Sequence, residues 1–187
     1  MGAARRLFAA CTAASLLFAA CASGKIPGED GVRARNLAGE YYELAQSYEN
    51  DAKYTKALEY YKKAMSDDRL HESAYFKTGR CYALLGEWSK AAAVYRDILQ
   101  RDSANMHVKA SLAYVYAMEG SYGKALSLYD ELVTEHPRDS SLLKNYILVL
   151  LADGQTERAQ ELLVDFKEKF PSETETISQL SARCAGK

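Results

Sequence analysis

Residues 82–95, YALLGEWSKAAAVY, hold the pattern that decides the fold, because it returns 34 residues later as YAMEGSYGKALSLY at 116–129. Alanine, glycine and tyrosine keep fixed places in this pattern along most of the chain. The recurring residues are Ala57, Ala91, Ala125 and Ala159; Gly86, Gly120 and Gly154; and Tyr61, Tyr95 and Tyr129. Self-similarity at a fixed period of this length is characteristic of proteins built by stacking one small structural unit.

Each repeated unit has the pattern of two helices. In the first unit, Tyr41, Leu44, Ala45 and Tyr48 recur at i, i+3, i+4 and i+7, which places them on one face of a helix over 38–50. A second helix is predicted over 54–66. The glycine of the pattern ends the first helix of each unit by adopting the left-handed cap conformation. Small residues inside the first helices, namely Ala45, Gly79 and Ala113, allow the paired helix to approach closely.

The period and these positions resemble the tetratricopeptide repeat family. The resemblance implies an all-α fold, a right-handed α-solenoid of four helix pairs over 38–71, 72–105, 106–139 and 140–173. The fourth unit departs most from the pattern, since Ile147 stands where a small residue is expected. Leu150, Thr156 and Leu163 replace three aromatic residues there.

Residues 174–187 are predicted to form a capping helix and tail. Ser172 and Glu175 have the spacing of a capping box. Ile177, Leu180 and Cys184 then follow at helical spacing, with polar residues between them. A helix with one apolar and one polar face is what the end of a solenoid requires.

The first 20 residues have the pattern of a signal peptide. Arg5 and Arg6 precede an apolar stretch over 7–20, which is shorter than the ~20 residues that span a bilayer. Leu17-Phe18-Ala19-Ala20-Cys21 resembles a bacterial lipobox, although leucine is more usual than Phe18. This resemblance implies cleavage before Cys21 and attachment of acyl chains such as palmitate to that cysteine.

An ordinary secretory signal is the alternative, because Ala20-Cys21-Ala22 also fits an A-x-A cleavage site. Residues 21–37 are rich in polar residues and glycine and contain Pro27. We expect a flexible tether there between the anchor and the repeats.

Function is expected on the groove that the first helices of the units form in this family. Residues on this face that the repeat does not need for packing are the candidate partner-binding residues Tyr42, Gln46, Phe76, Lys77, Arg80, His107, Tyr114, Lys144 and Asn145, with Glu49 beside them. The aromatic side chains suit an extended peptide, and the cations suit its carboxylates. A solvated face without a ligand is the alternative. The residues that clamp a C-terminal carboxylate in related co-chaperones are not reproduced here.

Catalytic and nucleic-acid-binding functions are not expected. The sequence has no HExxH, GxSxG, Walker or GxGxxG motif, and its three histidines are scattered. A net charge of −1 does not suit general nucleic-acid binding. No cofactor, metal or small-molecule substrate is predicted.

The sequence therefore predicts a lipid-anchored scaffold for protein–protein interaction in a bacterial envelope. It resembles the tetratricopeptide lipoproteins that help to assemble outer-membrane proteins or pilus secretins. Ala22 is not the aspartate that retains some lipoproteins at the inner membrane, which favours the periplasmic face of the outer membrane. A self-associating structural element and a soluble secreted adaptor are the alternatives.

Overall fold

The computed structural model describes residues 28–186 of the chain. These residues fall in two units that divide between Leu37 and Ala38. The described part contains nine helices and no strand. Their bounds are α2 Glu29–Asn50, α3 Tyr54–Ala64, α4 Asp68–Leu84, α5 Trp88–Arg101, α6 Met106–Met118, α7 Tyr122–Glu135, α8 Ser140–Ala152, α9 Thr156–Lys169 and α10 Thr174–Cys184.

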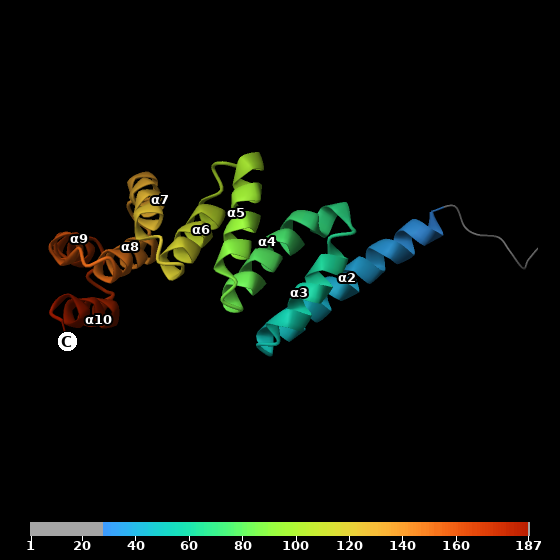
Figure 1. Ribbon diagram of the computed structural model, residues 1–187, viewed down its shortest axis with the longest axis horizontal. Helices are drawn as coiled ribbons and strands as arrows, with labels where there is room; N and C mark the ends of the chain where they lie inside the picture. Colours follow the sequence, from blue (N-terminus) through green and yellow to red (C-terminus); the bar gives the residue numbers. More distant parts are fainter. Residues whose placement is uncertain (1–27, 187) are drawn as a thin grey trace, which may run out of the picture. The chain divides into compact units, whose positions relative to one another are not determined.

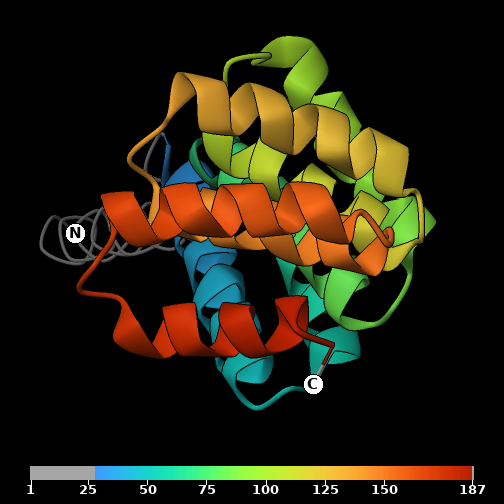
Figure 2. The ribbon, with the colours of Figure 1, turned by 90° about the vertical axis from the view of Figure 1, so that its left-hand side faces the viewer.

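The unit that begins at Ala38 is an all-α solenoid, as predicted. Each helix from α3 to α9 packs on the one that follows it, so that helix hairpins succeed one another along the unit (Figure 1). At the C-terminal end, α10 packs on both α9 and α8 (Figure 2). We call α2, α4, α6 and α8 the A helices and α3, α5, α7 and α9 the B helices.

The turns inside the hairpins share one backbone geometry. Gly86, Gly120 and Gly154 have φ values of +72°, +83° and +80°, as predicted for the residue after an A helix. The next N–H donates to the carbonyl five residues earlier, at 2.8–2.9 Å in every hairpin, which is the Schellman arrangement. In the first hairpin the equivalent residue is Ala52, with φ +57°. Ala52 therefore adopts a conformation that is strained for a residue with a Cβ atom.

Close packing within a hairpin depends on the small residues predicted for this role. Ala45 and Ala113 are fully buried. At Gly79, an added Cβ would lie 2.8 Å from Cε1 of Tyr95 and 3.0 Å from Cγ1 of Val94. Glycine in a helix costs about 1 kcal/mol relative to alanine, and here that cost is offset by direct contact between the backbone of α4 and the ring of Tyr95.

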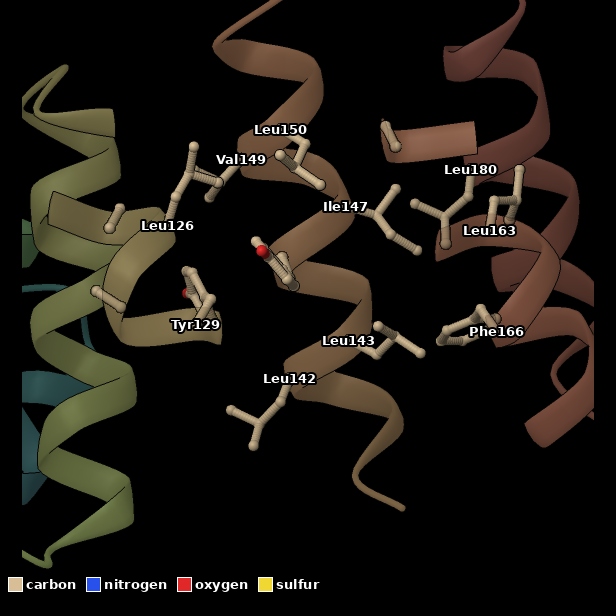
Figure 3. Close-up of a cluster of buried hydrophobic side chains, with 14 of the residues drawn as sticks. Leu126, Tyr129, Leu142, Leu143, Ile147, Val149, Leu150, Leu163, Phe166 and Leu180 are labelled. Atoms are coloured by element: carbon tan, nitrogen blue, oxygen red, sulfur yellow. The ribbon is translucent and has the colours of Figure 1, made fainter. Parts of the chain in front are cut away.

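In the last hairpin an aliphatic side chain, Ile147, stands where the other A helices have a small residue. Ile147, Leu150 and Phe166 are fully buried in a cluster that extends through α7, α8, α9 and α10 (Figure 3). Leu180 and Cys184 complete this cluster from α10, as their spacing predicts. The capping box predicted at the start of α10 is wrong, because the residue before the helix is Glu173 and no side chain caps it.

Helix α2 begins earlier than the sequence analysis predicts. It starts at Glu29, so residues 29–37 are helical and the prediction of a flexible tether is wrong for them. Alanine, arginine and leucine dominate 32–38, and these residues propagate a helix readily once the first repeat has nucleated it. The last helix-breaking residues before α2 are Pro27 and Gly28, and Gly28 has φ +92°.

The predicted signal peptide, Cys21 and the rest of the tether lie outside the described residues. Within residues 28–186, none of the helices combines the length and the apolar composition needed to cross a membrane.

Candidate functional site

A groove of about 1010 Å³ opens over the A helices of the unit that begins at Ala38. Most of its lining comes from α4 and α6, with one residue each from α2 and α8 and two from α5. The lining residues are Tyr42, Glu72, Ser73, Phe76, Lys77, Arg80, Ala83, Leu84, Tyr95, Ile98, Asn105, His107, Val108, Ala110, Ser111, Tyr114, Val115 and Asn145. We call this surface the groove.

Seven of the nine partner-binding residues proposed from the sequence line the groove together. They are Tyr42, Phe76, Lys77, Arg80, His107, Tyr114 and Asn145. Gln46 and Lys144 do not line it. Both lie on the outermost A helices, α2 and α8, each of which reaches the groove through a single side chain.

Glu49 differs from the sequence prediction that it belongs to the exposed face. Its carboxylate is buried and accepts two hydrogen bonds, from the Tyr61 hydroxyl at 2.6 Å and from Lys77 Nζ at 3.3 Å. It also forms an ion pair with Arg80, whose Nε lies 3.0 Å away. These contacts join α2, α3 and α4, and they compensate the cost of burying the carboxylate. We call Glu49, Tyr61, Lys77 and Arg80 the Glu49 cluster.

The protonation of the groups around Glu49 follows from burial and from its charge. Burial, followed by the hydrogen bond to Glu49, raises the pKa of Tyr61 well above its usual value. Burial raises the pKa of the Cys81 thiol to about 12, and the charge of Glu49 adds to this shift. Tyr61 and Cys81 are therefore neutral at physiological pH, and the two cations that face Glu49 are Lys77 and Arg80.

The two cations of the cluster differ in how far they remain available to a partner. The side chain of Lys77 is 22% exposed, whereas that of Arg80 is 54% exposed. Arg80 faces Glu49 with its Nε, and more than half of its side chain remains exposed. Both cations were predicted to bind the carboxylates of a partner, and the structure shows that each is already paired with Glu49.

The aromatic side chains of the groove are partly held by the core. The rings of Tyr42 and Tyr61 meet edge-on with centroids 5.4 Å apart, and those of Phe76 and Tyr95 lie 5.5 Å apart. Tyr114 is the most exposed of the groove aromatics, at 50%. It is therefore the ring best placed to pack against a partner.

Leu84 is a groove residue that the sequence analysis does not name. It lies one helical turn after Arg80 on α4 and is 44% exposed. The repeat could have identified Leu84 as a surface residue. The equivalent residue 34 positions later, Met118, is also large, apolar and exposed. An apolar residue that recurs at a position that the core does not use indicates a contact surface.

Possible metal ligands do not gather at the groove. Within residues 28–186, no three His, Cys, Asp or Glu side chains gather in a way that would hold a metal ion. Glu72, the one carboxylate of the lining, forms an ion pair with Arg101. The arrangement is suited to contact with a polypeptide, through rings, aliphatic side chains and one exposed guanidinium group.

Comparison with known proteins agrees with the helix pairs and with their period. The model of the family described as tetratricopeptide repeat matches residues 42–106 and 86–140. The chain belongs to the tetratricopeptide repeat family. No curated protein sequence was found to match it.

Solved structures of tetratricopeptide proteins share this fold at low sequence identity. MamA 41-end from Desulfovibrio magneticus RS-1 is 19% identical, with a TM-score of 0.66 over 78% of this chain and 84% of that one. A putative kinesin light chain repeat protein from Podosopora anserina is 15% identical, with a TM-score of 0.67 over 82% and 88% of the two chains. YrrB, described as a TPR protein with an unusual peptide-binding site, is 19% identical, with a TM-score of 0.58 over 78% and 75%.

Proposed function

We propose that this tetratricopeptide protein is a non-catalytic scaffold that binds an extended segment of a partner protein in the groove. The observation that carries the proposal is the groove itself, which is open and lined by rings and an exposed guanidinium group. Its volume of about 1010 Å³ is at the upper end of small-molecule sites, which are typically ~300–1,000 Å³. An open surface of this size suits a peptide better than a small substrate.

The exposed side chains of the groove support this proposal because they do not contribute to the core of the repeats. Core positions of the hairpins are filled by residues such as Ala91, Tyr95 and Tyr129, which are buried. By contrast, the groove residues Arg80, Leu84 and Tyr114 are 44–54% exposed. Exposed aromatic and arginine side chains are the types most enriched in protein interfaces.

Photocrosslinking from defined positions in the native cell tests the proposal. A crosslinking amino acid at Phe76, Tyr114 or Asn145 should capture the same partner protein. The same amino acid at Val164 or Lys124, exposed residues outside the groove, should not capture it. Capture from the outer positions alone would contradict a groove-bound partner, and capture of a second copy of the chain would establish self-association instead.

The scaffold is further proposed to be anchored in a bacterial envelope through Cys21. The sequence around Cys21 supports this placement, as does the apolar stretch before it. The similarity to tetratricopeptide lipoproteins suggests assembly of outer-membrane proteins or pilus secretins as the process served, on the periplasmic face of the outer membrane.

Metabolic labelling with a palmitate analogue tests the anchor separately from the groove. The native protein should incorporate the label, and a Cys21→Ser variant should not. A Cys11→Ser variant is the matched control and should be labelled like the native protein. A native protein that carries no label and is recovered in the soluble fraction would show that the chain is a secreted adaptor.

A further inference from the structure

Two exposed side chains of different chemistry lie one turn apart on α4, in the floor of the groove. From this arrangement we infer that the bound segment carries an acidic side chain and, two residues away, a large apolar side chain. Arg80 receives the acidic group, Leu84 and Tyr114 receive the apolar group, and Glu49 positions Arg80. The inference rests on the proposed function, because it specifies the segment that the same groove accepts.

The acidic subsite follows from the charges of the Glu49 cluster. One carboxylate is bound there to two cations, so a net positive charge remains. Lys77 is mostly buried, and its ammonium group lies 3.3 Å from Glu49. The surplus charge is therefore presented by Arg80, whose Nε is 3.0 Å from Glu49. A guanidinium group held through Nε still offers the N–H groups of both Nη atoms, which suit a carboxylate in a paired geometry.

The place of Glu49 in the repeat supports a role in binding. The equivalent residues of the other units are Ala83, Ala117 and Leu151, so a small or apolar residue satisfies the fold at this position. A buried ion pair adds little net stability compared with well-packed apolar side chains. Departures from a structural pattern tend to mark functional positions. We therefore assign Glu49 to the positioning of Arg80.

The apolar subsite is formed by Leu84 and Tyr114, which line the groove from α4 and α6. At 44% and 50% exposure, both leave much of their surface in water. Met118, one turn beyond Tyr114 on α6, is 48% exposed. A partner side chain such as leucine would remove part of this apolar surface from water, which is the main source of affinity in such contacts.

The spacing of the two subsites determines the spacing in the partner. Arg80 and Leu84 are four residues apart on a helix, which corresponds to a rise of about 6 Å. In an extended chain, side chains two residues apart point to the same side, and they are separated by about 6.6 Å. A glutamate and a leucine with one residue between them match the pair Arg80 and Leu84.

Fluorescence anisotropy with the full chain and synthetic peptides tests this inference. The probe is the labelled peptide Gly-Ser-Glu-Ser-Leu-Ser-Gly. Its companions replace the glutamate by glutamine, replace the leucine by serine, or place glutamate and leucine side by side. We expect each companion to bind at least fivefold more weakly than the probe.

Variants of the protein assign each preference to its subsite. Arg80→Ala should remove the preference for glutamate over glutamine and keep the preference for leucine over serine. Leu84→Ser should remove the preference for leucine over serine and keep the preference for glutamate over glutamine. The matched controls are Arg96→Ala on α5 and Val164→Ser on α9, since these exposed residues lie outside the groove lining. Both controls should bind the probe like the native protein.

A Glu49→Gln variant tests whether Glu49 positions Arg80 or only competes with the partner for its positive charge. Loss of the ion pair releases the Arg80 side chain, so affinity for the probe should fall severalfold and the glutamine companion should bind unchanged. The helical circular dichroism of this variant should match that of the native protein. An increase in affinity for the probe would show that Glu49 only competes with the partner, and it would overturn the positioning role.

The results distinguish failure of this inference from failure of the proposed function. The inference is overturned when peptides bind without regard to glutamate, or when Arg80→Ala keeps that preference. It is also overturned when none of the four peptides binds. In each case, capture of one partner from Phe76 and Tyr114 in the cell would still support a groove-bound segment.

Discussion

The core between α2, α3 and α4 and the core of the last hairpin bury different kinds of side chain. Around α2, α3 and α4 the core consists of alanines, Tyr61 and Cys81, and the carboxylate of Glu49 is buried beside them. Around α8, α9 and α10 the buried side chains are aliphatic and aromatic, including Ile147, Leu150 and Phe166. The buried charged residues of the described chain all lie before α7.

This contrast separates two tasks within one repeated fold. The C-terminal hairpin and α10 supply a large apolar core, which is the dominant source of stability in a solenoid. The groove lies over the A helices that precede this core, mainly α4 and α6, and rings, cations and a buried carboxylate there occupy positions that the repeat could fill with apolar residues. Stability therefore resides mainly in α8, α9 and α10, and binding resides mainly on α4 and α6.

Alkaline pH should produce the largest effect on stability, because it acts on buried tyrosines. Burial raises the pKa of Tyr95, Tyr129 and Tyr146 to about 12, against 10.0 for an ordinary tyrosine. Their stabilising contribution is complete below pH 10 and is lost as the pH rises from 10 to 12, since the unfolded chain then releases protons that the folded chain retains. Each tyrosine should lower the free energy of unfolding by up to about 1.4 kcal/mol per pH unit in this interval.

Thermal unfolding followed by circular dichroism between pH 7 and pH 11.5 measures this loss. A Tyr95→Phe variant should show a shallower fall in Tm above pH 10. Ordinary titration of every tyrosine near pH 10, observed by absorbance at 295 nm without unfolding, would contradict the burial of these rings.

Truncation of Phe166 should produce the largest effect of a single substitution. Its side chain is fully buried between the helices of the last hairpin, with its ring 5.1 Å from that of Phe170. Phe166→Ala should lower the free energy of unfolding by about 3–5 kcal/mol, measured by urea denaturation. Val164→Ala, two residues earlier on the exposed surface of α9, should change it by less than about 0.5 kcal/mol. Similar values for the two variants would refute the concentration of stability in this core.

Gly79→Ala should destabilise the protein although alanine favours helices. The new Cβ would lie 2.8 Å from the Tyr95 ring, and the displacement of that ring should cost about 1–3 kcal/mol. Gly39→Ala, on α2, meets nothing within 4 Å and should stabilise by about 0.5–1 kcal/mol. Urea denaturation should therefore show a lower free energy of unfolding for Gly79→Ala and a higher one for Gly39→Ala. A stabilising Gly79→Ala would show that α4 and α5 are not in close contact.

Ala52→Gly should produce a small effect, a gain in stability of about 0.5–1 kcal/mol. Ala52 has φ +57°, and glycine removes the strain of its Cβ atom, partly offset by the greater freedom of glycine in the unfolded chain. Gly86→Ala, at the equivalent place in the second hairpin, should lower stability. Differential scanning calorimetry of the two variants measures both changes. A lower Tm for Ala52→Gly would contradict the left-handed conformation of that residue.

The fold could be predicted from the sequence because the same type of residue recurs at each packing position in several repeats. Gly86, Gly120 and Gly154 mark the same turn, and Tyr61, Tyr95 and Tyr129 fill the same place in the core. Ala52 broke that pattern without changing the turn, because the surrounding hydrogen bonds impose the conformation. The start of α2 was missed because residues 29–37 have no repeat equivalent to compare.

The groove could be predicted as a face but not as a set of interactions. Register placed Phe76, Arg80 and Tyr114 on one surface, since residues at equivalent positions share a face. The burial of Glu49 beneath Lys77 and Arg80 depends on contacts between residues about 30 positions apart. Helical periodicity carries no information on such contacts.

Hydrogen exchange of the full chain, alone and with the Glu-Ser-Leu probe at saturation, tests the division of tasks most directly. We predict that amides in α8 and α9 exchange slowest in the free protein, and that the probe adds protection in α2, α4 and α6 only. Slower exchange in α2 and α3 than in α8 and α9, or added protection confined to α8–α10, would contradict the account.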